Sequence, residues 1–154
     1  MVQSLSLDSN SSPGAPDEFL GFTVVKLAHV LHQRMDAALR IEAGISVRQF
    51  GALTYLSREP GIGSAALARR LLITPQSAGP LIDDLVQRGL VDRDDAQSGV
   101  RKAARLTPKG QAALSKGFTV AERLRREDNS FLAPDDGRIV NAALLRLLAR
   151  LTGA

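Results

Sequence analysis

Two short helical segments separated by only two residues most constrain how this chain can fold. Residues 65–72 are rich in alanine, leucine and arginine, which are strong helix formers. Ile73 and Thr74 follow, and a threonine cap before Pro75 favours the start of another helix, whose apolar spacing continues to Arg88. The segment therefore predicts a helix-turn-helix unit.

Apolar residues recur at helical spacing on both sides of this unit. The spacing predicts long helices over about 17–43 and 109–152, the second interrupted near residue 134, and a further helix before Glu59-Pro60. The predicted caps and starts are Ser46, Ser64, Thr74, Pro108 and Pro134. The fold class is therefore mainly α, in one domain over residues 17–154.

A short hairpin is expected directly behind the helix-turn-helix unit. Leu90–Arg93 and Ala103–Thr107 read as two strands, with Ser98-Gly99 at the turn between them. Three helices followed by a two-stranded hairpin is the order of a winged helix-turn-helix, over about residues 46–108. In that fold the second helix of the unit enters a major groove and the hairpin reaches an adjacent groove or phosphates.

Positive charge is concentrated in the same region. The chain has 20 Lys and Arg against 16 Asp and Glu, and residues 64–110 hold an excess of three positive charges. Arg101, Lys102, Arg105 and Lys109 fall within nine residues that contain no acid. This run suits a polyanion such as nucleic acid, or it is an ordinary solvated surface.

Composition excludes several other classes of protein. The chain has no cysteine, which rules out disulfides, thiolate metal sites and cysteine nucleophiles. The N-terminal residues lack the pattern of a signal peptide, and no apolar stretch is long enough to cross a bilayer. We expect a cytoplasmic protein without membrane contact, preceded by a flexible, serine-rich arm at residues 1–16.

No motif predicts catalysis, a cofactor or a metal site. Residues 61–66 match the dinucleotide pattern G-x-G-x-x-A, but Arg58-Glu59-Pro60 precedes them where a buried strand is required. His29 and His32 share a helix face without a matching carboxylate, which makes a poor metal site. We therefore expect a protein that is not an enzyme.

Four segments, in this order, resemble the MarR (multiple antibiotic resistance regulator) family of bacterial transcription factors. They are Ser64-Ala-Ala-Leu-Ala-Arg-Arg-Leu71, Thr74-Pro-Gln-Ser-Ala78, Leu85-Val-Gln-Arg-Gly-Leu-Val-Asp-Arg93 and Leu106-Thr-Pro-Lys-Gly110. The resemblance implies a homodimer held by its first, fifth and sixth helices. Its two winged lobes would then bind a pseudopalindromic double-stranded operator, with half-sites about 10 base pairs apart.

The resemblance also implies which residues contact DNA. Gln76 and Ser77 are expected to face base edges, with Thr74 near the backbone or acting only as a helix cap. The wing and backbone candidates are Ser64, Arg93, Arg101, Lys102 and Arg105. Arg93 and Arg105 could instead form ion pairs with acids of the hairpin, and Asp84 with Arg88 is expected to be an ordinary pair along one helix.

This chain departs from the family at two places. Gly79-Pro80 stands inside the recognition helix, so that helix could kink or begin only there. Ser98-Gly99 replaces the common Asp-Arg pair of the wing, which leaves Arg101 as the favoured minor-groove cation.

Members of the family are often released from DNA by small organic, frequently aromatic, acids. His32, Arg48 and Tyr55 are the polar groups of the first two helices that could meet such an effector, although each could equally be a surface or core residue. The resemblance thus implies a sequence-specific DNA-binding transcriptional regulator, a repressor released by a small-molecule effector. The alternative is a dimeric interaction module or antirepressor that has lost DNA binding.

Overall fold

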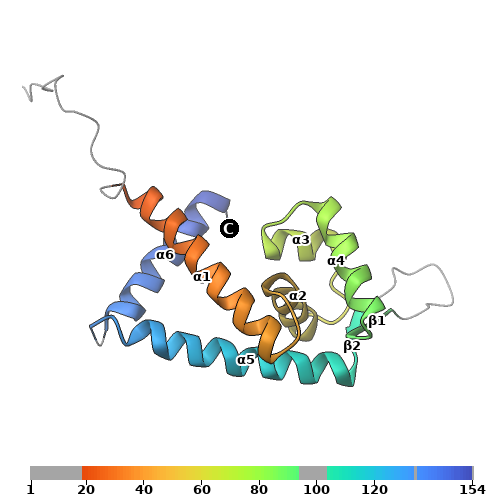
Figure 1. Ribbon diagram of the computed structural model, residues 1–154. Helices are drawn as coiled ribbons and strands as arrows, with labels where there is room; N and C mark the ends of the chain where they lie inside the picture. Colours follow the sequence, from red (N-terminus) through yellow and green to blue (C-terminus); the bar gives the residue numbers. More distant parts are fainter. Residues whose placement is uncertain (1–18, 94–103, 134, 154) are drawn as a thin grey trace, which may run out of the picture. The chain divides into compact units, whose positions relative to one another are not determined.

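The computed structural model describes residues 19–93, 104–133 and 135–153. The described residues form six helices and a two-stranded antiparallel sheet, drawn in Figure 1. In chain order the elements are α1 (Leu20–Glu42), α2 (Val47–Arg58), α3 (Ser64–Leu71), α4 (Pro75–Gln87), β1 (Val91–Arg93), β2 (Ala104–Leu106), α5 (Pro108–Asn129) and α6 (Asp136–Thr152). The predicted fold class, mainly helical with a small hairpin, is confirmed.

The chain divides into two compact units, residues 1–34 and residues 35–154. The first unit contains the beginning of α1, where Phe19 and Phe22 pack with ring centroids 6.4 Å apart. The second unit contains the winged helix-turn-helix and the two C-terminal helices.

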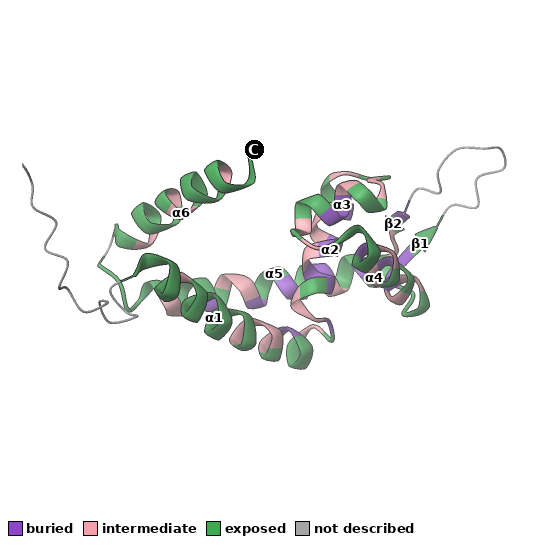
Figure 2. Ribbon diagram, turned by 90° about the horizontal axis from the view of Figure 1, so that it is seen from above, coloured by how far each residue is buried: buried purple, intermediate pink, exposed green. Residues whose placement is uncertain are grey.

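The core of the second unit lies where α2, α3, α4, the hairpin and α5 meet. Its fully buried side chains include Leu39, Leu53, Leu56, Leu67, Leu85, Val91 and Val120. Figure 2 shows this concentration of buried residues around α2 and α4. Across the α2–α5 contact, Phe50 meets Phe118 edge to face at 5.3 Å. The helix-turn-helix is therefore supported from behind by α2 and α5.

Helix starts follow from local capping in most cases. The Ser46 hydroxyl accepts from the Gln49 N–H while the Gln49 side chain accepts from the Ser46 N–H, a complete capping box. The Thr107 hydroxyl caps α5 by accepting from the Gly110 N–H. The prediction for Ser64 was wrong by one position: Gly63 is the N-cap, and Ser64 is the first residue of α3.

Two of the segments that carry the family resemblance contact each other in space. The Thr107 hydroxyl donates to the Gly89 carbonyl, and the Thr107 N–H donates to the Leu90 carbonyl. Gly110 lies so close that a Cβ there would be 1.9 Å from the Leu90 oxygen. The threonine and glycine of the segment 106–110 therefore fasten α5 to the turn that follows α4.

The recognition helix α4 is one continuous element. It begins at Pro75 and runs to Gln87 with Pro80 inside it, so the idea that it begins at Gly79-Pro80 was wrong. Pro80 is exposed and the space beside Gly79 is open. The proline costs the helix one backbone N–H but leaves the first turn helical.

Candidate nucleic-acid interface

The N-terminal half of α4 presents a polar, exposed face. Ala78, Ile82 and Leu85 bury the opposite face against the core. Gln76 and Ser77 are exposed, as expected for residues that reach outward, and Thr74 is exposed beside them. The Thr74 and Ser77 hydroxyls lie 2.8 Å apart, and Thr74 makes no capping bond to the backbone. An amide and two hydroxyls are therefore available on the first turn of the helix.

The beginning of α3 lies close to the base of the wing. A cavity of about 230 Å³ is lined there by Gly61–Ser64, Ile82, Arg93 and Ala104. No side chain caps α3, so its first backbone N–H groups are open to an outside acceptor. Ser64 and Arg93, two of the predicted backbone-contact residues, are thus brought together.

Arg93 forms an ion pair that the sequence did not predict. Its Nη2 lies 2.6 Å from Oδ1 of Asp83 on α4, while Asp94 and Asp95 of the hairpin lie outside the described residues. Both side chains remain substantially exposed, 37% for Arg93 and 54% for Asp83. The pair joins the wing base to the recognition helix while leaving the guanidinium accessible.

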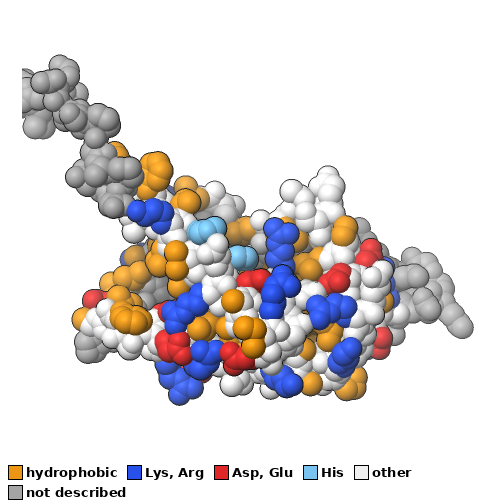
Figure 3. Space-filling model, in the orientation of Figure 1, with side chains coloured by type: hydrophobic (Ala, Val, Ile, Leu, Met, Phe, Trp, Pro, Cys, Tyr) orange, Lys and Arg blue, Asp and Glu red, His pale blue; other side chains and the backbone are white. Residues whose placement is uncertain are grey.

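The remaining wing candidates are placed only in part. Arg105 is exposed on β2, directly opposite Asp92 of β1 in the strand register. Arg101 and Lys102 lie outside the described residues. Basic and acidic side chains are interspersed on the face shown in Figure 3, so on that face positive charge is not segregated into a single patch.

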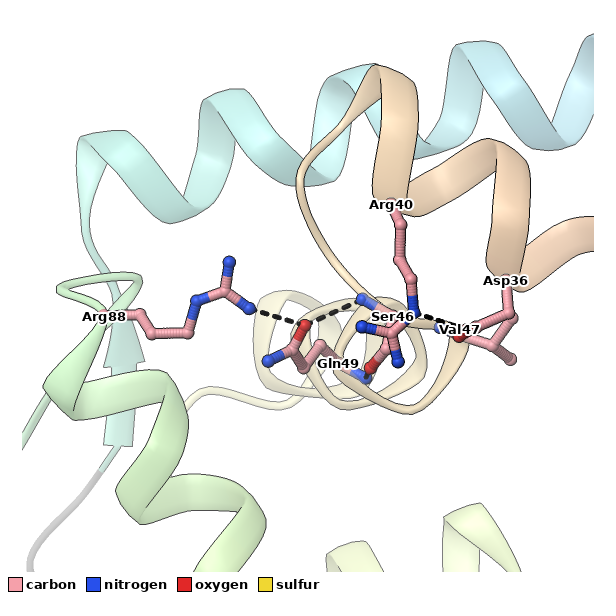
Figure 4. Close-up of polar contacts among 6 residues, drawn as sticks. All are labelled: Asp36, Arg40, Ser46, Val47, Gln49 and Arg88. Carbon is pink, nitrogen blue, oxygen red and sulfur yellow. Dashed lines mark hydrogen bonds and ion pairs between the residues drawn. The ribbon is translucent and has the colours of Figure 1, made fainter.

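A polar cluster at the far end of α4 was missed by sequence reasoning. Gln49 is buried, and its Nε2 donates to Asp84 Oδ2 at 2.5 Å. Its Oε1 accepts from Nη1 of Arg88 at 2.8 Å, as Figure 4 shows. Asp84 and Arg88 were expected to pair with each other along one helix. Instead, each binds Gln49 on α2.

The same cluster extends to α5 and to the loop after α1. Arg88 Nη2 donates to the Gly44 carbonyl at 2.6 Å, and Lys109 Nζ donates to the Arg88 carbonyl at 2.8 Å. An open cavity of about 300 Å³ beside these groups is lined by Arg88, Lys109 and Lys116 among small apolar residues. We call Gln49, Asp84, Arg88 and Lys109 the α4 clasp.

The end of α1 is tied to α2 next to the clasp. Asp36 Oδ1 accepts from the Val47 N–H at 2.9 Å, and Asp36 also pairs with Arg40 at 2.5 Å, as drawn in Figure 4. The carboxylate thus satisfies a backbone donor in the first turn of α2 that would otherwise lack a partner.

The predicted effector residues lie in different units. His32 is exposed in the first unit, whereas Arg48 is exposed and Tyr55 half-buried on α2 in the second. Among residues 19–93, 104–133 and 135–153, no group of three or more potential metal ligands occurs. Within the same ranges no helix has the length and apolar character needed to span a membrane.

Ion pairs on α5 shift the pKa values of three side chains, Glu122, Arg123 and Arg125. Arg125 donates to Glu122, which holds the pKa of the Glu122 carboxyl below its ordinary value. Glu127, together with Glu42, raises the pKa of Arg123. These exposed ion pairs belong to the surface of the helix.

Comparison with known proteins agrees with this architecture. The MarR family model matches residues 43–99. The HTH-type transcriptional repressor Rv2887 of Mycobacterium tuberculosis is 33% identical over 139 residues, which cover 90% of this chain and 86% of the relative. The Mycobacterium bovis repressor Mb2911 matches to the same extent.

Solved structures extend the similarity to the whole fold. Rv2887 in complex with salicylic acid matches with a TM-score of 0.68 and 28% identity, covering 90% of this chain and 98% of that one. Rv2887 in complex with DNA matches with a TM-score of 0.69 and 27% identity, covering 89% and 98%. The chain belongs to the MarR family of winged helix-turn-helix transcriptional regulators.

Proposed function

We propose that this protein is a homodimeric, sequence-specific repressor that binds double-stranded DNA through α4 and the wing and is released by a small organic acid. The observation that carries the proposal is the exposed polar first turn of α4, backed by a buried apolar face and followed by an antiparallel hairpin. The DNA-binding domain is proposed to span residues 17–154. The protein would act in the cytoplasm and catalyse no reaction.

Base reading is assigned to the first turn of α4. The Gln76 amide both donates and accepts, which suits adenine in the major groove, and the Ser77 hydroxyl can do either. Ser64 and the open N–H groups of α3 would hold phosphate oxygens, together with Thr74, Arg93 and Arg105. Arg101 and Lys102 are proposed for the adjacent groove.

Binding to the region upstream of the protein's own gene tests this proposal. We expect tighter binding to that duplex than to a scrambled duplex, with affinity falling steeply between about 50 and 200 mM salt. A folded dimer that binds neither duplex would favour the alternative, an interaction module or antirepressor.

Gln76→Ala sharpens the test of base reading. Loss of one bidentate amide contact should cost about 1–3 kcal/mol of operator binding and relax preference at one base pair. Gln87→Ala is the matched control, because Gln87 is exposed at the opposite end of the same helix. Equal losses in both variants would contradict the assignment.

Dimerisation is supported by apolar side chains that the chain itself leaves uncovered. On α6 no residue is buried, and its exposed apolar residues are Ile139, Val140, Leu145, Leu147, Leu148 and Leu151. Figure 2 shows α6 exposed or half-buried along its described length. A second copy of the chain would remove this surface from water.

Release by an organic acid is supported by the Rv2887 complexes with salicylic acid and p-aminosalicylic acid. We propose that Arg48 binds the carboxylate of the acid and that Tyr55 contacts its ring. Titration with salicylate should show weaker binding to Arg48→Ala and Tyr55→Phe than to the unaltered protein. Unchanged salicylate affinity in both variants would remove these residues from the effector site.

A further inference from the structure

The central residue of the α4 clasp is Gln49, whose amide finds donors at its oxygen and an acceptor at its nitrogen. The Gln49 oxygen faces two donors, the Ser46 N–H and the Arg88 guanidinium, while its nitrogen faces the Asp84 carboxylate. An amide suits this place because it is neutral, accepts at its oxygen and donates at its nitrogen. Gln49 is 7% exposed, and among the described residues it is the one buried polar side chain.

The clasp holds one end of the recognition helix. Asp84 and Arg88 lie in its last turn and cap, and Lys109 attaches the Arg88 carbonyl to α5. At the other end, Thr74 bonds only to Ser77 of the same helix, and burial of Ala78 and Ile82 provides the packing. Polar fixation of α4 by α2 and α5 therefore occurs at the end away from Gln76.

A small change in the angle of α4 at the clasp would displace the other end of the helix, where Gln76 lies. Gln76 and Arg88 are twelve positions apart, which corresponds to about 18 Å at the rise of an α-helix. A tilt of about 10° at the clasp would therefore move Gln76 by about 3 Å, more than the distance range within which a hydrogen bond holds.

We propose that Gln49 is a positioning residue for DNA reading: by joining α2 to Asp84 and Arg88, it sets the angle at which α4 meets the groove. The inference rests on the proposed function, in which α4 reads bases. Gln49 touches no base and acts only through α4.

The Gln49–Asp84 contact is the part of the clasp that can be altered cleanly. Arg88 borders an open cavity and also bonds Gly44, so replacing it would disturb several contacts. Gln49→Glu preserves the capping box, because glutamate at this position also accepts from the Ser46 N–H. It also keeps an acceptor for Arg88, but it sets a second carboxylate against Asp84.

Asp84→Asn provides both a control and a rescue. Alone, the asparagine can present its oxygen to Gln49 Nε2 and retain the bond. Combined with Gln49→Glu, it can turn its nitrogen toward the new carboxylate and restore a donor–acceptor pair. The four proteins form a double-mutant cycle in which only Gln49→Glu breaks the link.

Binding to the duplex from upstream of the protein's own gene and amide hydrogen exchange in α4 are measured on all four proteins. We expect Gln49→Glu to bind about tenfold more weakly and to lose protection in the last turn of α4, with both effects reversed in Gln49→Glu/Asp84→Asn. The melting temperature should fall in Gln49→Glu, because two carboxylates meet at a buried site, and should recover in the double variant, so binding is measured below the unfolding transition.

Four results would contradict this inference or the proposed function in distinguishable ways. Unaltered DNA affinity in Gln49→Glu would overturn the positioning role while leaving the proposed function intact. Equal losses in Gln49→Glu and the double variant would show that the Asp84 contact does not matter. If the unaltered protein bound no duplex, the proposed function would fail, and unchanged exchange in Gln49→Glu would refute the link itself.

Discussion

At the scale of single residues, Asp83 and a DNA phosphate would compete for the same guanidinium, that of Arg93 at the base of the wing. Arg93 is held 2.6 Å from Asp83, yet the same guanidinium borders the uncapped start of α3. An exposed ion pair contributes little to stability, so a DNA phosphate can replace the carboxylate at small cost. Asp83 therefore orients Arg93 in the free protein without blocking it.

Arg93→Ala tests this arrangement. We expect weaker operator binding and a salt dependence whose logarithmic slope falls by about one, because one phosphate contact is lost. Arg126→Ala is the control, since Arg126 is an exposed, ion-paired arginine on α5. A slope unchanged by Arg93→Ala would mean that Arg93 serves only as a partner of Asp83.

At the scale of elements, glycines inside helices have opposite physical roles. Gly79 in α4 faces open space, whereas Gly110 in α5 lies against the backbone of Leu90. The first touches no distant segment but precedes Pro80, whose ring disfavours a Cβ on the residue before it in a helix. The second permits two segments of the chain to touch.

Alanine should therefore be tolerated far better at Gly79 than at Gly110. Gly79→Ala is expected to change the free energy of unfolding by less than about 1 kcal/mol, because the gain in helix propensity is opposed by contact of the new Cβ with Pro80. Gly110→Ala should lower it by about 1–3 kcal/mol or more, because its Cβ would fall 1.9 Å from the Leu90 oxygen. Urea unfolding of both variants measures the difference, and a stabilised Gly110→Ala would contradict the close approach.

At the scale of the whole molecule, the exposed apolar face of α6 requires a partner. Leu148 is 45% exposed and Leu145 is 56% exposed, and no residue of α6 is buried. A symmetric dimer would bury both copies of such a face at once.

Leu148→Asp is expected to weaken the dimer strongly. Two carboxylates would enter a symmetric interface, and removing each from water without a partner costs several kcal/mol. Arg146→Asp adds the same carboxylate about 200° around the helix and should leave the dimer largely intact. Sedimentation velocity at several protein concentrations distinguishes the two. A dimer equally stable in Leu148→Asp would exclude this face from the interface.

The sequence by itself determined the helices, the order of the winged helix-turn-helix and the family, because these depend on local signals. Apolar periodicity, the Ser46 cap, and the Thr74-Pro75 and Pro108 starts act within a few residues. Gln76 and Ser77 could be named in advance because the resemblance to the MarR family places them near the start of the recognition helix, and both are exposed.

Only the tertiary structure decided which polar groups meet. Gln49 binds Asp84 and Arg88, 35 and 39 positions away, and Arg93 pairs with Asp83 of α4. A polar side chain has several possible partners along the chain, and packing selects among them by distance and direction. The link between Gln49 and the recognition helix could therefore not be predicted from the sequence. The position of Gln49 in the first turn of α2 is compatible with a capping role, but it does not indicate a contact with α4.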